Sequence, residues 1–503
     1  MSGSNLAAQL PQRAIKRSIV QSDGVHYYWA ALLGVAYSCE RGGSDNTPTA
    51  RGKEQDAMAR TVLVSFLGKG IRATEEQPRS HLGYRTAQYD FTHLGGSVEE
   101  SAMFGLALLR HLRTQNQKPN VWLVLGSPQS SWDALIEAVD IEALDSQQME
   151  TLNALLQQVE EAVKQEETHP SSKGSDSRTE TLLQEWARTL TMHLHPTQVR
   201  CFLIGWSYDR AEQEQLWKIL SEQTEKHDRL ILDITHGFRH QPMLTAFIVT
   251  LLNRLKRLSA VEFYYGALDM TPKTTSHTTQ NAPTPVLKID FVNDLIQATE
   301  ALATYQETGD YEPLANFALQ GNAKTQVRNL IFEQRVNKPH LSALQPAITA
   351  LKSFRASDSL RASLVPLILQ EAESLRGTVL HQRLVRQADK AMEHDNYMVA
   401  IPLLWEAVLS LACQLTGSGS PEEYQSREKA ESVLIEKPNH YLTDKERGDL
   451  RELRKVRNAV VHGTRRSERA QVKSALSSKD GMKRLYKQAR EIYDRLNSYL
   501  PRG

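Results

Sequence analysis

The chain has 503 residues, a formal net charge of +1 and three cysteines. Its length suffices for about two to four domains, each with a hydrophobic core of its own. A net charge this close to zero excludes nonspecific nucleic-acid binding through bulk charge, so any RNA contact requires a local basic patch. Cys39, Cys201 and Cys413 lie too far apart in the sequence for a disulfide framework or a zinc motif. We interpret all three as packing residues in a reducing cytoplasm.

Apolar runs in this sequence are short. The longest that we identify, His26 to Cys39, falls below the roughly 18 residues that a membrane span requires. It also lies too far from the first residue to be a normal signal peptide. We therefore expect a cytoplasmic protein that makes no membrane contact.

The first predicted domain begins at Met58. Residues 1–57 end in the polar run GGSDNTPTARGKEQDA, and we expect them to be a poorly ordered extension. From Met58 to residue 292, short apolar segments alternate with polar loops and helical stretches. The predicted strands are Thr61–Phe66, Val121–Leu125, Val199–Gly205, Leu230–Ile234 and Val261–Tyr265, and the predicted helices are 99–112, 132–139, 211–220 and 243–255. Strands that are apolar throughout indicate a parallel sheet with helices on both faces, which is a Rossmann-like α/β fold.

Four of these strands lead into loops rich in glycine, serine or threonine, at 67–70, 126–132, 205–207 and 235–239. Ligands of such sheets bind beyond the carboxyl ends of the strands, and backbone amides with hydroxyl groups suit phosphates or nucleotides. Neither Gly-x-Gly-x-x-Gly nor Gly-x-x-x-x-Gly-Lys-Ser/Thr is present, so the pattern favours neither a dinucleotide cofactor nor an ATPase P-loop. Ordinary turns and caps are the alternative for each loop, as for Ser131 before a helix at Trp132.

The remaining sequence is helical in character. A polar, helix-forming insertion interrupts the sheet domain at about residues 145–196, and residues 293–385 form successive helical segments. Residues 386–503 form a second, all-α domain with a buried helix within Ala391–Thr416 and a last helix at Gln471–Leu500. On the buried helix, Glu406 either faces the helix that ends at Gly463 or simply solvates one edge, and we favour the solvated edge.

The stretch Leu450–Gly463 has an apolar face and a basic face. It predicts a helix that stops at Gly463, because glycine readily adopts the left-handed conformation that follows a last helical turn. Arg457 and His462 have the Arg-x-x-x-x-His spacing of metal-independent RNA-cleaving helices, with the polar Asn458 beside the arginine. In that chemistry an imidazole moves the proton of an attacking ribose 2′-hydroxyl, and a guanidinium stabilises the charge that grows on the phosphate.

The spacing alone is weak support, because it occurs four times, at Arg188/His193, Arg335/His340, Arg376/His381 and Arg457/His462. We interpret the first three as coincidental, since only the last combines an unbroken amphipathic helix with a glycine stop. A solvated basic surface is the alternative for this pair. Residues 451–473 carry eight lysines and arginines against two glutamates, so they form the one local patch suited to RNA.

In this order, the features resemble the CARF-HEPN ribonucleases of type III CRISPR systems. The subgroup with Asp-x-Thr-His-Gly-Phe-Arg after a strand fits best, because Asp233–Arg239 carry this motif and Pro242 follows it. Supporting matches lie at 65–70, at 126–133, at Tyr265 and Gly266, and in the pair Arg457 and His462 with Asn458 and Gly463. The resemblance extends over residues 58–500.

The resemblance implies a homodimer or a higher oligomer without a metal or other cofactor. Residues 58–292 are then the CARF domain, whose two copies share one pocket for a cyclic oligoadenylate as allosteric ligand. Residues 386–503 are the HEPN domain, whose two copies form one site for single-stranded RNA, and residues 293–385 link the two. By position, the implied ligand-binding residues are Gly68, Lys69, Ser127, Ser131, Thr235, His236, Gly237 and Arg239. The implied catalytic residues are Arg457 and His462, supported by Asn458.

We therefore expect a messenger-activated endoribonuclease of CRISPR antiviral defence that leaves a 2′,3′-cyclic phosphate. Two alternatives remain open. The chain is a sensor or RNA-binding module without nuclease activity, or its sheet domain slowly hydrolyses its own ligand through Thr235, His236 or Lys69.

Overall fold

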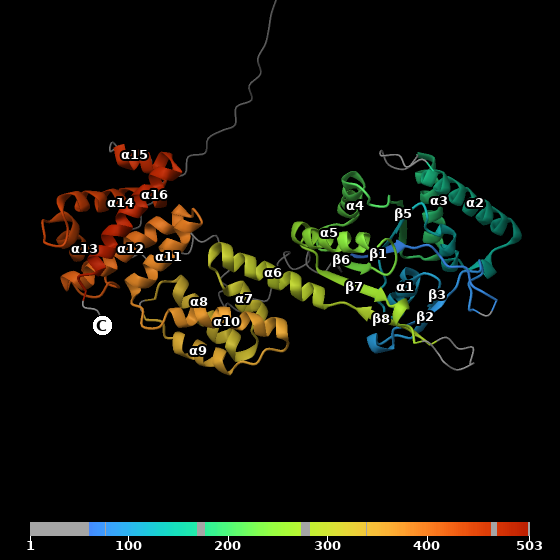
Figure 1. Ribbon diagram of the computed structural model, residues 1–503, viewed down its shortest axis with the longest axis horizontal. Helices are drawn as coiled ribbons and strands as arrows, with labels where there is room; N and C mark the ends of the chain where they lie inside the picture. The colour runs from blue at the N-terminus through green and yellow to red at the C-terminus, as the bar shows by residue number, and fades with distance from the viewer. Residues whose placement is uncertain are drawn as a thin grey trace, which may run out of the picture. The chain divides into compact units, whose positions relative to one another are not determined.

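The computed structural model describes residues 60–500 except positions 76, 169–176, 273–281, 339 and 464–469 (Figure 1). The extension predicted at residues 1–57 lies outside the described residues, and so does Cys39. Cys201 and Cys413 are both buried and unbridged, which confirms the packing interpretation for these two. The domain boundaries at 292 and 385 stay predictions.

Five parallel strands form one side of the eight-stranded sheet, in the order β7-β6-β1-β4-β5. They confirm all five predicted strands, with ends that differ by at most two residues. All seven residues of β1 are buried, as expected of a central strand that helices cover on both faces. The bounds are β1 (Thr61–Leu67), β4 (Val121–Gly126), β5 (Gln198–Leu203), β6 (Arg229–Asp233) and β7 (Ala260–Gly266).

Three further strands extend the sheet beyond β7: β8 (Thr284–Lys288), β2 (Ala87–Asp90) and β3 (Val98–Ser101). β8 runs antiparallel to β7 and parallel to β2, and β3 runs antiparallel to β2. The prediction of a helix from residue 99 was wrong at its start, because residues 99–101 belong to β3 and α1 (Phe104–Thr114) begins after it. The first three positions of β3 are exposed or half-buried, which suits an edge strand.

Helices cover both faces of the sheet and bury a separate hydrophobic core on each (Figure 1). α1 and the insertion helices α2 (Ser146–Thr168) and α3 (Ser177–His193) contribute to one core, which also receives Leu63 of β1. α4 (Arg210–Gln223) and α5 (His240–Lys256) contribute to the other, which receives Val62 and Val64. The predicted insertion is thus part of the core. A 3₁₀ helix at Trp132–Ala138 stands where an α-helix was expected.

The chain continues as helices after β8. The linker region comprises α6 (Phe291–Thr308), α7 (Glu312–Ala318), α8 (Gly321–Arg335), α9 (Leu344–Ser353) and α10 (Ser359–Ser374). These helices share one hydrophobic core, which includes the fully buried Leu314, Val327 and Ile368.

The C-terminal helical domain has its own core around α12 (Tyr397–Thr416). Its other elements are α11 (Leu380–Glu393), α13 (Tyr424–Glu431), a π-helical turn at Ser432–Glu436, α14 (Asp444–His462), α15 (Ala470–Ser477) and α16 (Lys479–Asn497). The last predicted helix is therefore two helices. They separate at Ser478, whose hydroxyl accepts the Gly481 N–H at 3.0 Å and so caps α16.

α12 corrects the expectation about apolar runs. Among the described residues it is the one helix that is long and apolar enough to cross a membrane, by length and composition. Its 20 residues exceed the stretch from His26 to Cys39. Most of α12 is buried inside the protein, however, which is the usual position of the central helix of an all-α domain.

Candidate functional sites

The loops that follow β1 and β4 are joined by hydrogen bonds. Ser131 Oγ accepts the Gly70 N–H at 2.9 Å, and Ser131 donates its own N–H to Gly68 O at 3.1 Å. Ser130 Oγ donates to Leu67 O at 2.5 Å and accepts the Ser127 N–H at 2.8 Å. The alternative for Ser131, a helix cap, does not hold, because its hydroxyl binds the neighbouring loop and makes no cap hydrogen bond. The predicted ligand residues of these two loops thus lie together.

The motif loop after β6 is tied to the ends of its two neighbouring strands. Thr235 donates its N–H to Asp233 Oδ1 and accepts the Gly266 N–H on its hydroxyl, both at 2.8 Å, which fixes the loop to the end of β7. Gly237 has a φ of +86°, and a Cβ added there would lie 3.2 Å from Phe66 of β1. Only glycine fits this position without strain. The motif loop is therefore held at the edge where β1 also ends.

The His236 ring connects the motif loop to α1. Its Nε2 accepts the Phe104 N–H at 3.2 Å, so the proton of the neutral ring sits on Nδ1. A Cβ added to Gly68 would lie 3.1 Å from Nδ1, so the ring is enclosed beneath that loop although the residue is partly exposed. This enclosure lowers the pKa of His236 to about 4. His236 is thus a neutral group at pH 7 that docks the start of α1 against the loops.

Asp233 is the buried anchor of the motif. Its side chain is 1% exposed, and burial raises the pKa of its carboxyl to about 7, against the opposing effect of hydrogen bonds from Thr235 and Ser65. The start of α1 is packed directly onto this group, since a Cβ on Gly105 would lie 2.5 Å from Ser65 Oγ and 3.1 Å from Asp233 Oδ2. Asp233 therefore organises the edge from within and is not on its surface.

Lys69 and Arg239 are the exposed cations among the predicted ligand residues.

Sequence reasoning missed Gln241, which is 1% exposed and joins the motif loop to the loop after β5. Its Nε2 donates to Gly205 O at 2.9 Å, and its Oε1 accepts the Phe238 N–H at 3.2 Å. Only its position in the first turn after the motif distinguishes Gln241 in the sequence.

α14 forms as the sequence predicts and ends at His462. Thr443 and Glu446 make a reciprocal capping box at its start, and Gly463 follows its last turn with a φ of +67°. Leu450, Leu453 and Val456 are fully buried against the core of the helical domain.

Arg457 is held by two neighbours. Its Nη1 donates to Asn458 Oδ1 at 3.0 Å, and its Nη2 lies 3.4 Å from Glu406 Oε1 on α12. Our preference for Glu406 as a solvated edge was therefore wrong, since its carboxylate faces α14. Glu406 Oε2 also accepts a 2.8 Å hydrogen bond from Arg427 Nη1 of α13.

His462 is exposed in the last turn of α14, whereas the Arg457 side chain is 25% exposed. Five residues of ideal α-helix separate two side chains by about 140° around the axis and about 7.5 Å along it. Within one copy, helix geometry therefore directs Arg457 and His462 to different sides of α14. Their catalytic roles stay predictions.

The basic surface of α14 is more neutral than its sequence indicates. Arg451 Nε lies 3.2 Å from Glu436 Oε2, and Arg454 pairs with both Glu431 and Glu436. These glutamates precede α14 in the chain, so counting charges within residues 451–473 missed them. Arg465, Arg466 and Arg469 of that patch lie outside the described residues.

Two of the other Arg-x-x-x-x-His pairs have structural roles. His381 is fully buried, its Nδ1 lies 2.6 Å from the Tyr493 hydroxyl, and burial lowers its pKa to about 4. Arg335 is paired with Asp310 and Glu312. Both observations agree with coincidental spacing. In the described part of the chain, no cluster of three or more His, Cys, Asp or Glu residues is arranged to hold a metal ion.

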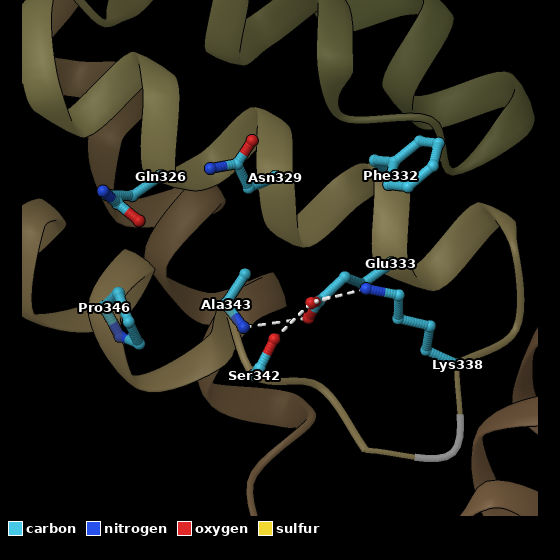
Figure 2. Close-up of a pocket in the computed structure, with 8 residues that line it drawn as sticks. All are labelled: Gln326, Asn329, Phe332, Glu333, Lys338, Ser342, Ala343 and Pro346. Atoms are coloured by element: carbon cyan, nitrogen blue, oxygen red, sulfur yellow. Dashed lines mark hydrogen bonds and ion pairs between the residues drawn. The ribbon is translucent and has the colours of Figure 1, made fainter.

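A pocket of about 340 Å³ lies between α8 and α9 (Figure 2). None of the predicted ligand-binding or catalytic residues lines it. Glu333 lines it and is 5% exposed. Its carboxylate accepts hydrogen bonds from Ser342 Oγ at 2.5 Å, the Ala343 N–H at 2.8 Å and Lys338 Nζ at 3.2 Å. Burial alone would raise the pKa of Glu333, but these donors outweigh it and lower the pKa. The Glu333 carboxylate thus joins α8 to the residues at the start of α9. Because protein donors already satisfy this carboxylate, we assign the pocket no ligand.

Comparison with known proteins places the sheet domain. Residues 62–268 match the family model for the CARF domain of the CRISPR system endoribonuclease Csx1. Over 217 residues, the chain is 22% identical to the CRISPR-associated protein MJ1674 of Methanocaldococcus jannaschii, covering 42% of this chain and 31% of that protein. The chain thus spans about a third of the length of this curated relative.

A solved structure, Enterococcus italicus Csm6 bound to cyclic hexa-2′-fluoro-hexa-dAMP, aligns with 88% of this chain and 96% of its own, at 11% identity. The TM-score of 0.30 is too low to support a structural argument. The part of the chain that carries the Asp233–Arg239 motif is therefore similar to a Csx1 CARF domain, and an all-helical region follows it.

Proposed function

We propose that this chain is a cyclic-oligoadenylate-activated, metal-independent endoribonuclease that cleaves single-stranded RNA in the cytoplasm during type III CRISPR defence. One observation carries the proposal. In the segment that matches the Csx1 CARF model, the Asp233–Arg239 loop lies at the carboxyl edge of the sheet, beside the tied loops after β1 and β4. Ligands of parallel sheets bind at this edge.

Chemically, the edge suits a nucleotide with several phosphates. Lys69 and Arg239 offer exposed positive charge, while the backbone and hydroxyl groups of the loops at Gly68, Ser131 and Thr235 are held in fixed positions. Fixed polar groups bind a ligand at a smaller cost in conformational entropy than mobile groups do. A cyclic oligoadenylate presents phosphates at regular intervals, which the charged and polar loops complement.

α5 supports the homodimer in this proposal. Met243, Phe247, Leu251 and Leu255 recur every fourth residue on α5 and are 61%, 70%, 51% and 59% exposed. Such an apolar stripe is unusual for a surface that faces water. α5 begins directly after the motif loop, so a second copy on this stripe, related by a twofold axis, would bring two motif loops toward one another. A ring of identical nucleotides matches that symmetry.

In the proposed reaction, His462 moves the proton of the attacking ribose 2′-hydroxyl, and Arg457 stabilises the negative charge on the non-bridging oxygens. The 2′-oxygen forms a bond to phosphorus, and the bond from phosphorus to the 5′-oxygen of the next nucleotide breaks. The 5′-oxygen takes up a proton and leaves as a hydroxyl, and a 2′,3′-cyclic phosphate remains. Asn458 orients Arg457 through its 3.0 Å hydrogen bond. Because one copy directs the two groups to different sides of α14, we propose that two copies of the helical domain complete the site.

A sensor or RNA-binding module without nuclease activity is the second candidate. It is favoured by the position of Arg457, which contacts Glu406 and Asn458, while His462 is exposed on another side of α14. Such a protein would bind the cyclic oligoadenylate and single-stranded RNA, and it would leave the RNA intact.

RNA cleavage assays distinguish the two functions. Purified full-length chain is incubated with labelled single-stranded RNAs of varied sequence, with and without cyclic oligoadenylates of different ring size, in the presence of EDTA. The proposal expects cleavage that rises with one ring size, persists in EDTA and yields 2′,3′-cyclic phosphate ends. Messenger binding without any turnover would instead establish the sensor.

A further inference from the structure

Three charged side chains meet where α13 and α14 each pack against α12. Glu406 of α12 accepts from Arg427 of α13 at 2.8 Å and lies 3.4 Å from Arg457 of α14. All three are largely covered, since Glu406, Arg427 and Arg457 are 16%, 32% and 25% exposed. We refer to these residues as the Glu406 triad.

The two distances show that Glu406 is shared unequally. Arg427 makes the shorter, charge-assisted hydrogen bond, whereas the contact to Arg457 is at the outer limit for a hydrogen bond. The carboxylate is thus neutralised mainly by Arg427, and it orients Arg457 while leaving most of the charge of that guanidinium available.

The triad also has unused capacity for an anion. Two guanidinium groups and one carboxylate carry a net charge of +1, and the side chains of Arg427 and Arg457 remain 32% and 25% exposed, so the triad is not sealed from solvent. An uncompensated positive charge that reaches the surface favours an anion. A phosphodiester supplies one negative charge and several acceptor oxygens, which matches the deficit.

We infer that Glu406 is a positioning residue for Arg457, and that Arg427 keeps the triad positively charged so that an RNA phosphodiester binds there. The inference rests on the proposed function, because it assigns the RNA phosphate to this site. It expects RNA affinity to follow the net charge of the triad, which is 0 after Arg427→Met and +1 again after Arg427→Met with Glu406→Gln.

The test measures the affinity of a short fluorescein-labelled single-stranded RNA for full-length protein in a His462→Ala background, which prevents cleavage. Adding Arg427→Met weakens RNA binding about tenfold, the loss expected for a contact to a charged group. Adding Glu406→Gln as well restores affinity to within about threefold of the background. A purely structural ion pair predicts the reverse, since removing both partners would leave the double variant at least as impaired as the single one.

Arg495→Met in the same background is the matched control. It removes a 2.7 Å ion pair between α16 and Glu446 of α14, so it tests whether any lost ion pair on this helix weakens RNA binding. We expect RNA affinity to be unchanged. Arg427→Lys keeps the charge and retains affinity within about threefold. Circular dichroism checks folding, and Arg427→Gln replaces the methionine variant should that variant fail to fold.

The inference is overturned if the double variant binds RNA no better than Arg427→Met, if Arg495→Met weakens binding equally, or if the His462→Ala protein binds no RNA. Failure of the nuclease proposal shows itself separately, as wild-type protein that cleaves no RNA or cleaves as well as His462→Ala. In that case the order of RNA affinities still decides whether the Glu406 triad binds a phosphodiester.

Discussion

In the sheet domain, Gly68, Ser131 and Thr235 are far apart in the sequence yet belong to neighbouring loops, because parallel strands end at the same edge. In the helical domain, Arg457 and His462 are five residues apart, yet α14 directs them to different sides. The comparison shows that closeness in sequence is a poor guide to a shared site on a helix. The loops of the first candidate site are brought together within one copy, whereas the two side chains of the second are not.

The two regions also present positive charge differently. Lys69 and Arg239 are exposed at the sheet edge, whereas Arg451, Arg454 and Arg457 of α14 each lie against a glutamate. An anion at the sheet edge can therefore contact the exposed cations Lys69 and Arg239 directly. An anion at α14 competes with carboxylates, so binding there depends on how each glutamate is shared.

The largest expected effect tests the helical domain alone. His462→Ala should reduce messenger-stimulated RNA cleavage about a thousandfold, because a general acid-base group contributes about 10² to 10⁴ in rate. Affinity for the cyclic oligoadenylate, measured by calorimetry, should not change. His193→Ala is the matched control, since His193 follows Arg188 at the same spacing on α3. Full activity in His462→Ala would move the chemistry to another residue.

The next effect tests whether the buried groups hold the sheet edge together. The pKa of Asp233 is raised to about 7 from its ordinary value of 3.8, so its contribution to stability is full below pH 3.8 and is lost as the pH rises toward 7. The pKa of His236 is lowered to about 4 from 6.5, so its contribution is full above pH 6.5 and is lost as the pH falls toward 4. Between about pH 4 and pH 7, the stability contribution of Asp233 therefore falls with rising pH while that of His236 rises.

Asp233→Asn removes the pH dependence that Asp233 contributes to stability and leaves the pH dependence that His236 contributes. Above pH 7 this variant should be more stable than the wild type by at most about 4 kcal/mol, because each pH unit of pKa shift corresponds to about 1.4 kcal/mol. Between pH 4 and 6.5 its melting temperature should rise with pH more steeply than that of the wild type. Scanning calorimetry from pH 4 to pH 8 provides both comparisons. Parallel curves for the two proteins would show that Asp233 is not protonated in the folded state.

A smaller effect tests the exposed cations. Arg239→Ala should weaken cyclic oligoadenylate binding about tenfold to a hundredfold, because a hydrogen bond to a charged group is worth about 1.5 to 3 kcal/mol. Isothermal titration calorimetry measures the change. Arg210→Ala is the control, since Arg210 is an exposed arginine at the start of α4 that pairs only within its helix. Equal affinities for all three proteins would place the ligand elsewhere.

The smallest effect tests the tie between the first two loops. Ser131→Ala leaves the Gly70 N–H without its acceptor and should cost about 1 kcal/mol of stability. The ligand affinity should fall a few-fold, because the loop must then be ordered on binding. Ser363→Ala removes an exposed hydroxyl on α10 that bonds only to its own helix, so its effect on both quantities should be negligible. A ligand affinity unaffected by Ser131→Ala would separate the tie from the binding site.

Of the five strands that the sequence predicts, four are buried along most or all of their length, and β5 at the end of the sheet is partly exposed. β1 is apolar along its whole length because helices cover both sides of it, and this pattern needs no knowledge of its neighbours. β2, β3 and β8 are four or five residues long with mixed polarity, so their pairing partners define them more than their composition does. Short strands of mixed polarity are not distinguishable from loops in a single sequence.

The candidate sites show the same division. The loop at Asp233–Arg239 and the end of α14 at Gly463 are local patterns, so the sequence predicts their positions. Gln241, Glu406 and Arg427 act through contacts with segments that lie 21 to 51 residues away or in another loop, and nothing in their local sequence indicates the partner. The hydrogen bond from the Gly70 N–H to Ser131 Oγ was likewise not predicted, because Gly70 lies in the loop of another strand.

α5 carries the motif loop at its first turn and an exposed apolar stripe along its length. A substitution that rotates or shifts α5 therefore changes the positions of both the motif loop and the apolar stripe. Under the proposed homodimer, exchanging either the loop or the stripe without the other should therefore yield chains that fold but neither dimerise nor bind the cyclic oligoadenylate normally.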